Sequence, residues 1–146
     1  MKNFSFLIFF ACICSLLASC NLPLIGNTQP VDGYMRTASD SIHFYRWTEA
    51  NGIISGTWTI GIVQNGKSQF LSGHLSGIHN GEQISLTLDG VPGAKATASG
   101  TIKDRVITLQ APRDDGSIET VTYQAVTLEE YNAALTDFKK KYPETK

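Results

Sequence analysis

The chain has no cysteine after residue 20, because its three cysteines are Cys12, Cys14 and Cys20. A disulfide framework, common in small secreted domains, is therefore excluded for the rest of the chain. A zinc site built on thiolates is excluded there for the same reason. The folded part of the protein must be stable through its hydrophobic core alone.

The chain also has no large excess of positive or of negative charge. The chain has 12 basic and 13 acidic residues. Without Lys2, which lies in the N-terminal segment interpreted below as a signal peptide, these become 11 and 13, a net charge of −2. No basic stripe or block precedes the C-terminal Lys139-Lys140-Lys141. Nucleic acid is therefore not expected as a partner.

Known catalytic motifs are missing as well. The sequence has no H-E-x-x-H and no S-x-x-K, and in Gly73-His74-Leu75-Ser76-Gly77 the serine stands one place too late for a nucleophile elbow. The histidines are His43, His74 and His79, and no spacing predicts the three or four converging ligands that zinc requires. We therefore predict no catalytic residue, metal or cofactor, and a protein that is not an enzyme.

No apolar run is long enough for a typical membrane span. The longest, from Phe4 to Leu17, has 14 residues, whereas a transmembrane helix needs about 20. A lysine, a short apolar run and small residues in this order are typical of a signal peptide, here residues 1–19. An uncut N-terminal membrane anchor is the alternative.

Leu17-Ala18-Ser19-Cys20 resembles the lipobox of bacterial lipoproteins. The resemblance implies that Cys20 becomes the N-terminus and is acylated, with chains such as palmitate, so that the protein is held on a membrane of the cell envelope. It also implies an outer membrane in a Gram-negative source and the outer leaflet of the cell membrane in a Gram-positive one. Residues 20–32, with Pro23, Gly26 and Pro30, are then a lipidated N-terminus and flexible tether.

From residue 33 to 146 the sequence predicts one all-β domain. Asx-Gly pairs, which favour two-residue hairpin turns, occur six times between Asp32 and Gly116. With two further turns they bound eight expected strands, near residues 33–38, 42–49, 53–64, 68–79, 82–89, 94–103, 106–112 and 117–126. Short connections favour an antiparallel up-and-down meander that closes into a small barrel. A curved open sheet and a β-sandwich are the alternatives.

Alternation with a period of two gives each strand one apolar face, as for Ile54, Gly56 and Trp58. The repeated Ser-Gly pairs within strands are interpreted as points of curvature. The inward positions include six Gly or Ala residues and no charged one, so any ligand inside should be apolar. Whether these small residues leave a cavity or let the walls close-pack stays open.

Eight meandering strands followed by a helix resemble calycin-type barrels, the lipocalin and avidin architecture. Gly56-Thr57-Trp58 matches the G-x-W letters of lipocalins, although on the third expected strand rather than the first. The resemblance implies a barrel that is filled by side chains or holds one small ligand.

The helix is expected over residues 128–141. Thr127 and Glu130 form a capping box, an apolar stripe with helical spacing includes Leu135 and Phe138, and Pro143 ends the helix. The stripe should lie on the barrel wall or across an opening. The lysine run suits the C-terminal helix dipole and is interpreted as solvated rather than bound to anionic lipid.

The strand near 42–49 is unusual because both of its faces are apolar or aromatic. Either one face is core and the helix covers the other, or Tyr45 and Trp47, with Arg46 nearby, form a patch that holds a sugar or a partner protein. Trp58 and Tyr123 are the expected neighbours of any interior cavity. We therefore expect a membrane-anchored binding lipoprotein that holds a small apolar ligand or an envelope protein or glycan; the alternative is a structural or interaction lipoprotein with a filled barrel.

Overall fold

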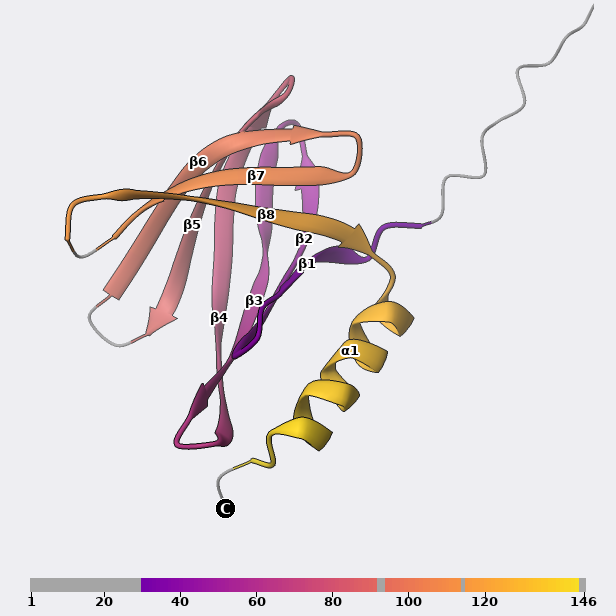
Figure 1. Ribbon diagram of the computed structural model, residues 1–146. Helices are drawn as coiled ribbons and strands as arrows, with labels where there is room; N and C mark the ends of the chain where they lie inside the picture. The colour runs from indigo at the N-terminus through magenta and orange to yellow at the C-terminus, as the bar shows by residue number, and fades with distance from the viewer. Residues whose placement is uncertain (1–29, 92–93, 114, 145–146) are drawn as a thin grey trace, which may run out of the picture.

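The computed structural model describes residues 30–91, 94–113 and 115–144. Within them, eight antiparallel strands form a closed barrel in chain order, and β8 pairs with β1 (Figure 1). The strands are β1 (Gly33–Thr37), β2 (Ser41–Ala50), β3 (Ile53–Gln64), β4 (Lys67–Asn80), β5 (Gln83–Val91), β6 (Ala94–Lys103), β7 (Val106–Pro112) and β8 (Ile118–Val126), followed by the helix α1 (Leu128–Lys141). The predicted barrel with a C-terminal helix is thus confirmed. The expected signal segment 1–19, Cys20 and the tether up to residue 29 lie outside the described residues.

Two of the hairpin turns have the expected backbone. Asn51-Gly52 and Asn65-Gly66 have φ values of 53°, 75°, 52° and 75°, so both central residues are left-handed, as a type I′ turn requires. The turn between β6 and β7 reaches the same region without glycine, at Asp104 and Arg105. Short polar and flexible residues at these tips allow each strand to return directly beside its predecessor.

Glycines on the inner wall permit the tight curvature of the barrel. A Cβ atom at Gly100 would collide with the carbonyl oxygen of Thr108 on the neighbouring strand. A Cβ atom at Gly73 would stand 2.9 Å from the Trp58 indole, which lies across that glycine. The interpretation of the glycines as points of curvature and close approach therefore agrees with the structure.

A first hydrophobic core fills much of the barrel interior. It consists of side chains that point inward from seven strands: Tyr45, Ile54, Trp58, Leu75, Ile84, Leu86, Ala98, Ile107, Leu109 and Tyr123. At roughly 1.5–3 kcal/mol for each large buried side chain, this cluster is a major source of stability for the sheet.

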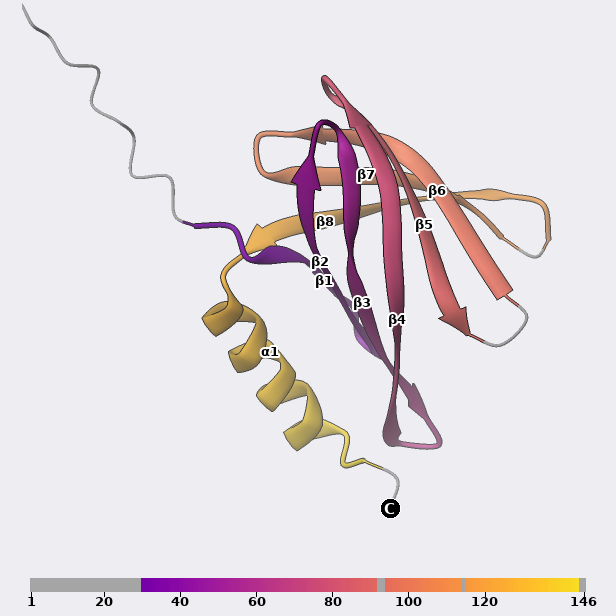
Figure 2. The same cartoon turned by 180° about the vertical axis from the view of Figure 1, so that it is seen from behind.

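A second core lies outside the barrel, between the wall and α1 (Figure 2). Phe44 of β2 stacks on Tyr131 at 3.9 Å, and Phe70 of β4 meets Phe138 edge to face at 6.1 Å. The helix therefore covers the Ile42–Phe44 face of β2, while Tyr45 on the opposite face enters the barrel. Both faces of β2 are buried around Phe44 and Tyr45, which explains the aromatic side chains there.

The strand directions give the barrel two different ends. The chain enters at Gly33, beside the last residue of β8 and close to the start of α1; we call this the entry end. The turns after β1, β5 and β7 lie at the opposite end, which we call the mouth. In Figure 1 the entry of β1 is on the right and the ends of β5 and β7 are on the left.

Candidate functional site

A cavity of about 580 Å³ opens at the mouth of the barrel. Its walls carry apolar side chains that converge from five of the strands: Ile60, Leu88, Ala96, Ala98, Leu109, Ala111 and Val121. The small residues of β6 and β7 leave this space, because larger side chains at the same positions would meet across it. The interior therefore contains both a packed core and, at the mouth, an open cavity.

Strand pairing places a second, polar set of side chains in the same cavity. Arg36 of β1 lies opposite His43 of β2 in the antiparallel register. Both share the inward face with Tyr45, because alternate residues of a strand point to the same side. Tyr123 and Glu119 reach the cavity from β8, whose pairing with β1 closes the barrel.

The two tyrosines and the histidine form a short hydrogen-bonded chain inside the cavity. The hydroxyl oxygens of Tyr45 and Tyr123 are 3.0 Å apart, and the Tyr123 hydroxyl is 3.4 Å from Nδ1 of His43. The two tyrosine rings also stack, with their centroids 4.6 Å apart. The central hydroxyl belongs to Tyr123, which therefore joins the other two groups.

Burial keeps these groups neutral. Loss of water, followed by the positive charge of Arg36, lowers the pKa of His43 from 6.5 to about 4, against a smaller opposing effect of Glu119. Burial likewise raises the pKa of Tyr45 and of Tyr123 above the usual 10.0. At neutral pH the chain consists of two phenols and an uncharged imidazole.

The mouth itself is charged. One carboxylate oxygen of Glu119, Oε2, lies 3.0 Å from Nη2 of Arg113 and accepts a hydrogen bond from its Nε at 3.1 Å. The other oxygen, Oε1, lies 3.8 Å from Nη2 of Arg36. Lys95 also lines the cavity and pairs with Asp89 at 3.1 Å. The expectation that no charged residue faces the interior is therefore wrong at this end, because β1 and the start of β8 carry inward-facing charges just below the rim.

The residues predicted to contact a ligand are distributed over different parts of the molecule. Tyr45 and Tyr123 line the cavity. Trp58 is 3% exposed and donates its indole N–H to the carbonyl oxygen of Asp89 at 3.0 Å, as part of the filled core. Arg46 is exposed on the outward side of β2, away from the cavity residues of the same strand.

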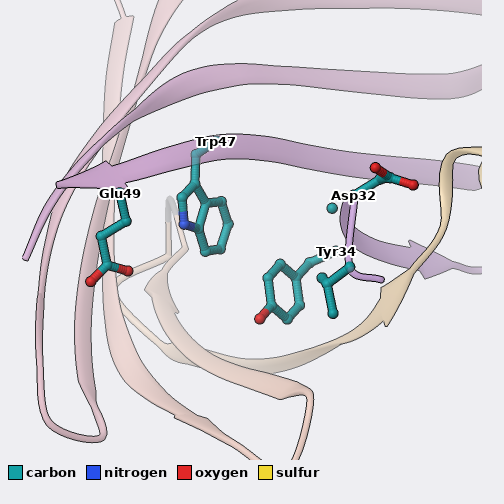
Figure 3. A pocket seen from close by; sticks show the side chains of 6 residues that line it. Asp32, Tyr34, Trp47 and Glu49 are labelled. Carbon is teal, nitrogen blue, oxygen red and sulfur yellow. The ribbon is translucent and has the colours of Figure 1, made fainter. Parts of the chain in front are cut away.

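Trp47 belongs to a smaller cavity of about 220 Å³ at the entry end. Its indole stacks on the Tyr34 ring with centroids 4.9 Å apart, and Asp32 and Glu49 flank the pair (Figure 3). Each carboxylate has a structural partner: Asp32 accepts the backbone N–H of Leu128 at 2.9 Å, and Glu49 contacts Nδ1 of His79 at 2.9 Å. These contacts attach α1 and β4 to the entry end, so the larger cavity is the better candidate for binding.

Within the described parts of the chain, no group of three or more His, Cys, Asp or Glu side chains is arranged to hold a metal ion. Over the same residues, no helix is both long enough and apolar enough to cross a lipid bilayer. The cavity offers an apolar wall, neutral hydrogen-bonding groups and a charged rim, an arrangement suited to holding a small molecule.

Sequence reasoning did not identify Arg36, Arg113 or Glu119 as cavity residues. For Glu119 a signal was present: the alternation that places Tyr123 and Val121 inside also places Glu119 inside when it is continued by one step. For Arg36 the signal was weaker, because β1 is only five residues long.

No protein-family model matches the chain. No curated protein sequence and no solved structure is significantly similar to it.

Proposed function

We propose that this protein is an exported lipoprotein, anchored through Cys20, that binds a small and mainly apolar molecule in the barrel cavity. The observation that carries the proposal is the cavity of about 580 Å³ at the mouth of the barrel, whose lining is mainly apolar. Ligand pockets typically have volumes of about 300–1,000 Å³ and mostly hydrophobic linings. A barrel that served only as a scaffold would be expected to have a close-packed interior throughout.

The proposed role is binding rather than catalysis. A general base works best when its pKa is near the operating pH, whereas the pKa of His43 is lowered to about 4 by burial and by Arg36. Tyr45 and Tyr123 have raised pKa values because of burial, so their hydroxyls remain protonated and act as neutral hydrogen-bonding groups. These properties favour the binding of a molecule that is released without chemical change.

The anchor places the proposed function in the bacterial cell envelope. The lipobox-like Leu17-Ala18-Ser19-Cys20 supports this proposal. Two or more acyl chains give stable membrane attachment, whereas one chain gives only marginal binding. The membrane is the outer membrane in a Gram-negative source and the cell membrane in a Gram-positive one.

Mass spectrometry of the protein extracted from its own membranes tests both parts. A denatured mass that exceeds that of residues 20–146 by a diacylglyceryl group or more is expected from the anchor. An additional mass present only under native conditions is expected from the bound molecule. An unmodified full-length mass would contradict the anchor.

Two matched variants locate the ligand. Ala111→Phe adds a ring inside the half-buried wall of the cavity, and we expect it to abolish the native-only mass. Thr57→Phe adds the same ring on the exposed outer face of β3 and should retain that mass. If the protein without any substitution shows equal native and denatured masses, the alternative role of a structural or interaction lipoprotein is favoured.

A further inference from the structure

The cavity lining is electrically unbalanced. Its ionisable side chains that are charged at neutral pH are three cations and one anion, Arg36, Lys95, Arg113 and Glu119, which gives 3 − 1 = +2. Lys95 has Asp89 as an outside partner, and counting that carboxylate leaves +1. A purely apolar ligand would leave this charge uncompensated.

Glu119 shows how the mouth holds an anion. Its carboxylate lies between two guanidinium groups, bound closely by Arg113 and loosely by Arg36. The 3.8 Å separation from Arg36 is longer than a hydrogen bond. Arg36 therefore keeps N–H donors for another acceptor, since a guanidinium carries five.

Arg36 is also the deepest of the three cations. Its charge acts on the inner hydrogen-bonded chain, because it is the second cause, after burial, of the lowered pKa of His43. Its side chain is 29% exposed, compared with 55% for Arg113 and 71% for Lys95. An anion at Arg36 would be partly shielded from water, where ionic hydrogen bonds are stronger than at a free surface.

The remaining polar groups add donors rather than acceptors. When His43 accepts a hydrogen bond at Nδ1 from Tyr123, its other nitrogen, Nε2, carries the proton of the neutral ring. That tautomer gives the cavity one more N–H donor beside Arg36. The carboxylate of Glu119, the main acceptor at the mouth, is already engaged by Arg113.

We propose that the ligand of this cavity is a single-tailed amphiphile with one anionic oxygen group, a carboxylate or a phosphate, bound by Arg36 at the mouth while the tail lies along Leu88 and Leu109. This inference rests on the proposed function, because it names the chemical class that the cavity takes. Glu119 occupies part of the same two-arginine site. It therefore competes with the anionic group of the ligand.

Calorimetric titration of the lipidated chain, residues 20–146, in phospholipid nanodiscs tests the inference, with protein-free nanodiscs as the blank. The probes are decanoate, decyl phosphate, decanol and decyltrimethylammonium, at slightly alkaline pH so that decanoate is ionised. Decanoate or decyl phosphate should bind about 10- to 100-fold more tightly than decanol, which is the range of one charge-assisted hydrogen-bonded contact. The preferred anion of the two identifies the headgroup, and the cationic probe should bind weakest.

Three variants separate the site from general effects. Arg36→Met should reduce anion binding to the level of decanol and leave decanol binding unchanged. Arg46→Met removes the same charge from the exposed outer side of the same strand and should change neither. Glu119→Gln removes the competing carboxylate and should strengthen anion binding several-fold, which keeps the test valid even where Arg36→Met fails to fold.

Equal binding of decanoate, decyl phosphate and decanol would overturn the anion inference and leave the proposed function standing. Weaker anion binding in Glu119→Gln would overturn it as well. Failure of every probe to bind would overturn both, and loss of affinity in Arg46→Met equal to that in Arg36→Met would show that only the overall charge matters.

Discussion

At the scale of single residues, Tyr123 is the polar group on which the barrel interior depends most. Its hydroxyl contacts both Tyr45 and His43, whereas the Tyr45 hydroxyl contacts Tyr123. Removing it leaves two buried groups without that partner. Removing the Tyr45 hydroxyl leaves Tyr123 still bonded to His43.

We therefore expect Tyr123→Phe to lower the free energy of unfolding by about 1–3 kcal/mol, the cost of an unsatisfied buried group, and Tyr45→Phe by about 0.5–1.5 kcal/mol. Urea unfolding of both variants beside the unmodified protein measures the difference, provided that the dependence on urea stays the same. Equal losses in the two variants would mean that the 3.4 Å contact between Tyr123 and His43 contributes nothing.

His43 makes the stability depend on pH. Burial, followed by the charge of Arg36, lowers its pKa from 6.5 to about 4 in the folded protein. As the pH falls below 6.5, the unfolded chain binds a proton that the folded chain resists, so stability is lost between pH 6.5 and about 4. The loss is at most about 3 kcal/mol and is reduced by solvent screening, because the ring is partly exposed.

Unfolding free energies measured across this pH range for the unmodified protein and for His43→Gln test the prediction. The difference between the two should shrink as the solution is acidified. His74→Gln is the control, since His74 lies exposed on the outer wall of β4. A pH dependence that is the same in His43→Gln and in the unmodified protein would rule out His43 as its source.

At the scale of elements, α1 stabilises the barrel from outside without entering the cavity. Phe138 is 9% exposed and packs against Phe70 of β4 and Tyr142 beyond the helix. Asp32 fixes the start of the helix through the backbone N–H of Leu128. The helix therefore joins the entry of β1 to the long β3–β4 hairpin.

Phe138→Ala should lower the unfolding free energy by about 3–5 kcal/mol, as expected for a large aromatic side chain removed from a core. Leu128→Ala, at the exposed start of the same helix, should change it by less than about 0.5 kcal/mol. Thermal or urea unfolding of both variants provides the measurement. Ligand binding should remain in the folded fraction of each variant, because α1 lies against the outer wall; its loss in Phe138→Ala would show that the helix supports the cavity.

At the scale of the whole molecule, most of the fold was predictable because its determinants are local. Most Asx-Gly pairs mark hairpin turns, alternation marks the inward faces, and Thr127 with Glu130 marks the start of α1. The turn expected at Asp89-Gly90 was wrong, because this pair lies within β5, where the pairing with β6 is irregular. The observed strand limits differ from the expected ones by a few residues at most. For example, β4 was expected near residues 68–79 and runs from Lys67 to Asn80. Short connections then leave few topologies other than a meander.

The interior cavity was less predictable from the sequence, because it forms only when the barrel closes. Tyr123 and Trp58 were expected beside an interior cavity, but only Tyr123 lines it. Tyr45 was expected in a patch with Trp47 for a sugar or a partner protein, and it lines the cavity instead. Arg36 and Glu119 meet only because β8 pairs with β1, and no local pattern records that register. Trp47 and Trp58 have the same alternation as Tyr45, yet their positions along the barrel put one at the entry end and the other in the filled core.

The mouth and the N-terminal entry stand at opposite ends of the barrel. If Cys20 carries the acyl anchor that we propose, the domain would be attached at the Gly33 end, and the cavity opens at the other end. The domain would then collect its cargo from the aqueous side, or from a facing surface across the gap, rather than lift it out of the bilayer that holds it. Under the proposed function, the ligand would then be delivered by another molecule of the envelope rather than by the anchoring membrane.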